Sequence, residues 1–164
     1  MYNRRMARRL ALPLLAALVL TGCESRDVEK DLMIVDVNTG WYDAGVQDNG
    51  SNKLVPSVSL GLRNVSDRDI ASVQLNAVFR RVGEVESWGE HFINAINSGG
   101  LAVGATTQPI VLRSTLGYTG TDPRLQMLQN KEFVDATVAV FGKHGSRMWV
   151  KMGEFPIDRQ LLTE

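Results

Sequence analysis

The chain has 164 residues, of which 44% are hydrophobic and 22% charged, and 18 basic residues balance 18 acidic ones. This composition is typical of a globular chain and excludes collagen-like, low-complexity and strongly disordered proteins. The single cysteine excludes a disulfide-stapled scaffold and a zinc site built from several cysteines. The charges are unevenly distributed, because the first 22 residues hold four arginines and no acidic residue.

The N-terminus has the features of an export signal. Arg4, Arg5, Arg8 and Arg9 precede an uninterrupted apolar run over residues 10–20. At 1.5 Å per helical residue the run spans roughly 16 Å, which is too short for a helix to cross a membrane. A basic segment followed by a short apolar segment therefore predicts a secretory signal peptide.

The apolar run ends in Leu20-Thr21-Gly22-Cys23, which resembles the lipobox of bacterial lipoproteins. The resemblance implies that a diacylglyceryl group is transferred to the Cys23 thiol, that the chain is cleaved between Gly22 and Cys23, and that the new N-terminus is acylated. The alternative is an incidental cysteine behind a true membrane anchor. Glu24 follows in place of the aspartate associated with inner-membrane retention, which favours the outer membrane, facing the periplasm.

These features predict three regions: a signal peptide (1–22), a lipidated N-terminus with a short tether (23–31), and one folded domain (32–164). The tether residues are polar and charged, and a short helix leading into the first strand is an equally good interpretation. Without the signal peptide the chain carries 14 basic and 18 acidic residues. An acidic domain has no general attraction for nucleic acid or anionic lipid, so membrane attachment is expected to come from the acyl chains.

Alternation of apolar and polar residues predicts strands through most of the domain. The clearest example is the run of inward-facing residues from Val73 to Phe79, and Asn38-Thr39-Gly40 is expected to end the first strand. A short helix is expected over 122–130, capped by Asp122, with Leu125 and Leu128 facing the sheet. The predicted strands lie at 32–37, 58–62, 73–79, 91–96, 107–112, 133–141 and 148–152, the last two forming a hairpin.

Seven or eight short strands separated by turns predict an all-β, immunoglobulin-like antiparallel β-sandwich. The alternating runs 58–66 and 70–79 are similar to the central hairpin of FxLYD-type immunoglobulin-like domains, in which an Asn-x-Ser turn joins two alternating strands. Residues 101–106 resemble the Leu-x-Pro-Gly-x-Thr turn of those domains, with Val103 in place of proline. The FxLYD signature itself is absent, so the resemblance bears on the fold alone.

The sequence contains few candidates for catalysis. His91 follows Glu90, but adjacent strand residues point to opposite faces, so a surface or edge histidine is expected in place of an acid–histidine pair. His144 is expected in a solvated turn. Residues 48–52 have the composition of a calcium loop without its residue order, and turn chemistry accounts for them. We therefore expect no catalytic residue, metal or cofactor.

The aromatic residues are the better candidates for recognition. Core packing is expected for Trp88 and Trp149, whereas Trp41, Tyr42 and Tyr118 are equally consistent with the core and with an interaction surface. The turn-rich segment 113–123 is the expected interaction segment. The sequence thus predicts a non-catalytic envelope lipoprotein that binds another envelope protein. The alternative is a small-ligand or glycan module using the loop aromatics.

Overall fold

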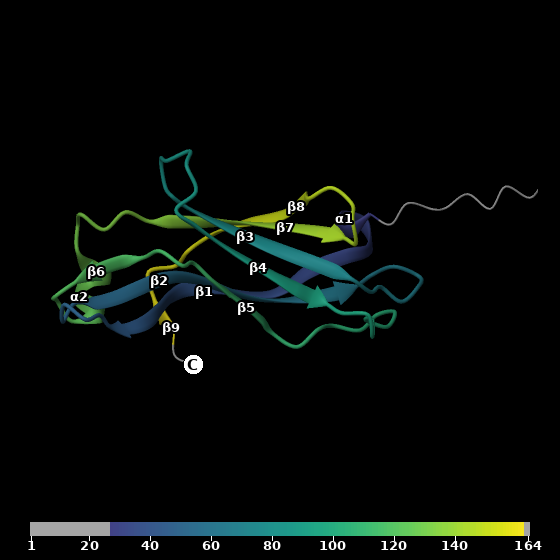
Figure 1. Ribbon diagram of the computed structural model, residues 1–164, viewed down its shortest axis with the longest axis horizontal. Helices are drawn as coiled ribbons and strands as arrows, with labels where there is room; N and C mark the ends of the chain where they lie inside the picture. Colours follow the sequence, from purple (N-terminus) through teal and green to yellow (C-terminus); the bar gives the residue numbers. More distant parts are fainter. Residues whose placement is uncertain (1–26, 163–164) are drawn as a thin grey trace, which may run out of the picture.

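A computed structural model describes residues 27–162, so the predicted signal peptide, Gly22 and the predicted acylation site Cys23 lie outside the described residues. The described chain forms two β-sheets stacked face to face (Figure 1). One sheet has the order β5-β2-β1-β9, with β6 also paired to β2, and the other has the order β4-β3-β7-β8. The predicted all-β sandwich is confirmed, with nine strands in the described part instead of seven or eight.

The elements follow one another as strands with two short helical insertions. The strands are β1 (Leu32–Val46), β2 (Asn52–Asn64), β3 (Val73–Arg81), β4 (Gly89–Ile96), β5 (Ile110–Arg113), β6 (Tyr118–Gly120), β7 (Ala136–His144), β8 (Val150–Pro156) and β9 (Leu161–Leu162). The helices are α1 (Val28–Asp31) and α2 (Arg124–Gln129). Antiparallel hairpins join β1 to β2, β3 to β4 and β7 to β8.

The centre of the core comes from one face of β2 and one face of β3. Alternate residues of both strands are turned inward and are almost completely buried, as the sequence pattern predicts. They are Val58, Leu60, Leu62, Val73, Leu75, Ala77 and Phe79, each at most 1% exposed. The two sheets therefore pack through the residues that alternation identifies.

Strand β1 is longer than predicted, because Asn38-Thr39-Gly40 lies within it. The pairing with β2 shifts register between Val35 and Asn38, where Asp36 has a positive φ of 52°. This bulge lets the strand continue through residues that would otherwise favour a turn. At Gly40 a Cβ atom would lie 2.8 Å from the Leu162 side chain, so the glycine permits the close approach of β9.

Of the two interpretations of the segment before the first strand, the structure supports the short helix. Asp27 caps α1, its Oδ1 accepting a hydrogen bond from the Glu29 backbone N–H at 3.3 Å. Val28 is 5% exposed and belongs to the core. The packed domain therefore includes α1 and begins before residue 32.

The predicted helix at 122–130 is present, but its cap and its buried face differ from the prediction. Pro123, and not Asp122, occupies the cap position of α2, and no side chain caps the helix. Leu125 is 61% exposed, whereas Met127 and Leu128 are buried. The inward face of α2 is therefore 127–128, not 125 and 128.

Candidate functional site

Two of the aromatic residues considered for recognition lie in a cluster inside the sandwich. Trp41 is fully buried, and its ring centroid lies 4.6 Å from that of Phe133, 5.6 Å from that of Tyr118 and 6.1 Å from that of Trp88. The hydroxyl of Tyr118 donates to the Val134 carbonyl oxygen at 3.1 Å. Of the two placements left open for Trp41, the structure supports the core and not the interaction surface, because β1 continues through it, while Trp88 packs against the core as predicted.

Tyr42 and the segment 113–123 also differ from an open loop surface. The Arg113 guanidinium lies 3.5 Å from the centre of the half-buried Tyr42 ring. Ser114 is buried, and β6 within this segment pairs with β2. The start of the segment and β6 therefore help to hold the sheet together, while Leu116, at 53% exposed, and residues 121–123 remain exposed.

The outer face of the sheet β4-β3-β7-β8 exposes a row of polar and aromatic side chains. Every second residue of β3 from Val73 to Phe79 points inward, so the intervening Gln74 and Asn76 point outward. Asn76 pairs with Phe92 on β4 and with Phe141 on β7, and this register places the three side chains in one row. We refer to this surface as the outer sheet face.

An exposed aromatic pair lies on the outer sheet face. Phe92 is 54% exposed and Trp149 is 39% exposed, and their rings meet edge to face with centroids 5.9 Å apart. The ammonium of Lys143 lies 4.9 Å from the centre of the Trp149 ring. We refer to Phe92 and Trp149 together as the aromatic patch. The prediction that Trp149 packs in the core is wrong, because it lies just before β8 and turns outward over the sheet.

The sequence carried a signal for half of this patch. Phe92 lies between His91 and Ile93, which pair with inward-facing residues of β3, so alternation places Phe92 on the opposite face. The contact with Trp149 brings together residues more than fifty positions apart, from the two ends of the sheet order. Local periodicity contains no information about that pairing.

Polar side chains surround the aromatic patch. Gln74 donates to Asn94 at 3.0 Å, and Asn76 donates to Glu90 at 3.2 Å. The Oδ1 atom of Asn76 is buried and has no hydrogen-bond partner among the described residues. The outer sheet face therefore offers aromatic surface, amides, a carboxylate and a cation within one layer.

Glu90 and His91 do not act as a pair. Glu90 lies on the outer face, whereas His91 pairs with the inward-facing Ala77 and reaches the neighbouring sheet edge. There its Nδ1 atom accepts the Arg113 backbone N–H at 2.9 Å, which links β4 to β5. His91 is thus the edge histidine that strand geometry predicts, and it contributes to closing the sandwich.

The segment with calcium-loop composition is the turn between β1 and β2. Asn49 Oδ1 accepts hydrogen bonds from the backbone N–H of Ser51 at 3.0 Å and from its hydroxyl at 2.7 Å. Gly50 has φ of 80°, a conformation that favours glycine. Within residues 27–162 there is no group of three or more His, Cys, Asp or Glu side chains arranged to hold a metal ion.

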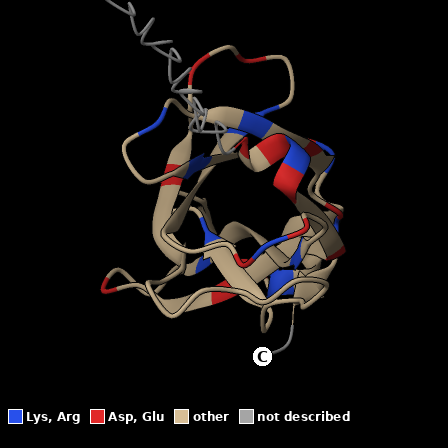
Figure 2. Cartoon of the chain, turned by 90° about the vertical axis from the view of Figure 1, so that its right-hand side faces the viewer, with Lys and Arg blue, Asp and Glu red and all other residues tan. Residues whose placement is uncertain are grey.

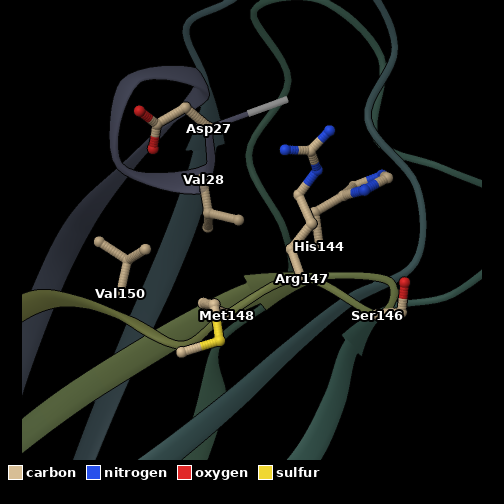
Figure 3. Close-up of a pocket in the computed structure, with 7 residues that line it drawn as sticks. All are labelled: Asp27, Val28, His144, Ser146, Arg147, Met148 and Val150. Carbon is tan, nitrogen blue, oxygen red and sulfur yellow. The ribbon is translucent and has the colours of Figure 1, made fainter. Parts of the chain in front are cut away.

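An open pocket of about 420 Å³ lies beside α1, at the turn between β7 and β8 (Figure 3). In Figure 3 the Val28 side chain points toward Val150 and Met148, and Arg147 rises beside His144. Met148 is 85% exposed. The lining residues are Asp27, Val28, His144, Ser146, Arg147, Met148 and Val150.

Neither α1 nor α2, the helices of the described part, has the length and apolar character that crossing a bilayer requires. No family model matches the chain, and no curated protein is significantly similar to it.

Proposed function

We propose that this chain is a lipid-anchored, non-catalytic module of the bacterial envelope that binds another envelope protein through its outer sheet face. The basic and apolar N-terminal segments and the sequence Leu20-Thr21-Gly22-Cys23 support the anchor. Acyl chains on Cys23 would hold the domain firmly, since two or more chains bind a membrane far more tightly than one. Glu24 favours the outer membrane, with the domain in the periplasm.

The observation that carries the binding role is the exposed aromatic patch. Aromatic side chains are enriched at protein interfaces because they bury a large area at little cost in conformational entropy. Phe92 and Trp149 contact each other and Lys143 contacts Trp149, so the patch is already ordered before a partner arrives. The hydrogen-bonded pair of Asn76 and Glu90 lies beside it and supplies the polar rim.

A photo-crosslinking amino acid in place of Phe92 tests this role in intact cells. We expect a discrete crosslinked product with one protein partner, which the additional change Trp149→Ala removes. The same amino acid in place of Leu125, which is 61% exposed on α2, is the matched control and should give no such product. Equal products from both positions, or none from position 92, would contradict the proposal.

The anchor has a separate test. Cys23→Ser removes the thiol that accepts the diacylglyceryl group, so acyl labelling and processing by signal peptidase II should both be lost. The matched control is Glu24→Gln, which leaves the Cys23 thiol and the preceding Gly22 in place. Unchanged processing of the Cys23→Ser chain would refute the anchor.

A second candidate is a glycan-binding module on the same face. It would use Phe92 and Trp149 instead of the loop aromatics, because an aromatic ring offers apolar surface to the C–H face of a sugar and nearby amides bond its hydroxyls. The exposed amide pair of Gln74 and Asn94 favours this candidate, since exposed amides can hydrogen-bond sugar hydroxyls beside an aromatic surface. Co-sedimentation with purified peptidoglycan that Trp149→Ala abolishes would support glycan binding over a protein partner.

A further inference from the structure

One end of the sandwich gathers the start of the described chain and three loops. Figure 1 shows α1 at the same end of the long axis as the β2–β3 loop (65–72), the loop before β5 (97–109) and the β7–β8 turn (145–149). Direct contacts join them: the Val65 N–H donates to the Asp31 carbonyl at 3.0 Å, and the β7–β8 turn shares a pocket with Asp27 and Val28. We refer to α1 with these three loops as the tether end.

Each of the three loops exposes an apolar side chain. Val65 is 50% exposed, Val103 is 54% exposed and Met148 is 85% exposed. Each comes from a different loop, so the three form a set of separate tips at one end of the domain.

The loops that carry these tips are held in place by hydrogen bonds. Asn64, which is fully buried, donates through Nδ2 to the carbonyls of Arg68 at 2.8 Å and Leu101 at 2.9 Å. The Val103 N–H donates to Asp69 Oδ1 at 3.3 Å. The first two loops are thereby joined into one unit, and their apolar side chains are presented by a fixed scaffold.

The tether end carries four acidic residues (Glu29, Asp31, Asp67 and Asp69) and three basic ones (Lys30, Arg68 and Arg147), so its charges nearly balance and attraction to a membrane has to come from its apolar side chains. Figure 2, seen from this end, shows basic and acidic residues interspersed along the chain. The β7–β8 turn and the end of β7 contain Lys143 and Arg147 and no acidic residue over 143–149. Cations beside an apolar tip suit the boundary between lipid phosphates and acyl chains.

Chain length determines which end of the domain faces the bilayer. Asp27 follows Cys23 by four residues, and four residues reach at most about 14 Å even when fully extended. The other end carries exposed apolar residues too, such as Val85 at 91% in the β3–β4 loop. Strand β3, with nine residues, separates the ends by roughly 30 Å, so the short tether brings only the tether end to the membrane.

We propose that the tether end docks on the lipid bilayer, with Val65, Val103 and Met148 at the headgroup boundary. This inference rests on the proposed acyl anchor at Cys23. Docking through apolar tips needs no net positive charge, and the anchor supplies the local concentration that three small side chains alone would not achieve. The domain would then stand upright, with the long axis of the sandwich close to the membrane normal.

The test uses the full acylated chain in vesicles of phosphatidylethanolamine and phosphatidylglycerol. Met148→Cys and, as the matched control, Val85→Cys each receive an environment-sensitive fluorophore, while the acylated Cys23 thiol does not react. Both positions are exposed in loops, so neither change disturbs the core. We expect lipid-embedded quenchers to reduce the fluorescence at position 148 several-fold more than at position 85.

Flotation of the vesicles separates failure of the anchor from failure of docking. If the chain does not float with the vesicles, both the anchor and the docking are overturned. If it floats and the two fluorophores are quenched equally, docking alone is overturned. If position 148 is shielded in native envelopes but not in protein-free vesicles, a protein or cell-wall partner covers the tether end, which also overturns docking on lipid.

Discussion

Asn64→Asp is a nearly isosteric change that tests how the loops of the tether end are held. Asn64 is fully buried, and its Nδ2 atom donates to the carbonyl oxygens of Arg68 and Leu101 at 2.8 and 2.9 Å. Its Oδ1 atom accepts from the backbone N–H and the hydroxyl of Ser66, at 3.0 and 2.8 Å. An aspartate keeps the two acceptor contacts but places an oxygen against two carbonyl oxygens.

The magnitude follows from the two donors that are lost. The Arg68 carbonyl keeps the Ser66 hydroxyl as a donor and the Leu101 carbonyl keeps the Ile70 N–H, so the loss is that of two hydrogen bonds, about 1–3 kcal/mol in the free energy of unfolding. A buried carboxylate facing carbonyl oxygens raises this cost further. The total free energy of unfolding of a native domain is about 5–15 kcal/mol, so Asn64→Asp is expected to be one of the most destabilising single substitutions.

Urea denaturation followed by circular dichroism measures the change. Asn94→Asp is the matched control, because it adds the same charge on the exposed outer face and preserves the oxygen that accepts from Gln74. We expect the control to shift the free energy of unfolding by no more than about 0.5 kcal/mol. Equal effects of the two substitutions, or a loss below about 1 kcal/mol for Asn64→Asp, would refute the hydrogen-bond argument.

The remaining predictions concern the aromatic residues and two cations. Trp41→Ala should cost about 3–5 kcal/mol in urea denaturation, whereas the half-exposed Trp149→Ala should cost less than about 1.5 kcal/mol; similar losses would argue against a buried Trp41. A hydrogen bond and then the charge of Lys151 lower the pKa of Glu154 from 4.5, so Lys151→Met should raise it in an NMR titration. The lowered pKa of Glu154 stabilises the native state above pH 4.5, and this contribution is lost as the pH falls through the lowered pKa. Because both side chains are about half exposed, the contribution stays below about 1 kcal/mol. A Glu154 titration that Lys151→Met leaves unchanged would contradict this prediction. Arg159 donates to the backbone carbonyl of residue 133 at 2.8 Å. Arg159→Lys should therefore lower the free energy of unfolding by about 1 kcal/mol and speed amide hydrogen exchange in 128–135. Unchanged exchange in this segment would disprove the prediction.

The sequence pattern predicted correctly those strands in which one face is buried and the other is exposed. Apolar residues occupy every second position from Val73 to Phe79, and all four of these inward positions are buried. The length of β1 could not be inferred in this way, because Asn38-Thr39-Gly40 favours a turn locally and is overruled by pairing with β2 and by the close approach of β9 at Gly40. Tertiary pairing of this kind leaves no local signal.

The candidate site was harder to predict than the fold for a related reason. A tryptophan adds the same apolar surface to a core and to an interface, so composition does not distinguish Trp41 from Trp149. What distinguishes them is position: Trp41 lies in a central strand, and Trp149 lies at the start of a hairpin arm, outside the alternation of β8. The exposed patch therefore emerged only when the register of the sheet was known.

The aromatic patch and the tether end share one turn, and this proximity narrows the class of partner. Trp149 follows Met148 directly, so a Met148 side chain at the headgroup boundary holds the patch just above the membrane, facing sideways. A soluble protein would lose orientational freedom to reach that position, and its approach would be hindered by the lipid surface. A protein that is itself anchored in the same membrane is already confined to that layer, which raises its effective concentration at the patch without any additional contact. Under the proposed docking, the geometry therefore favours a membrane-bound partner over a soluble one.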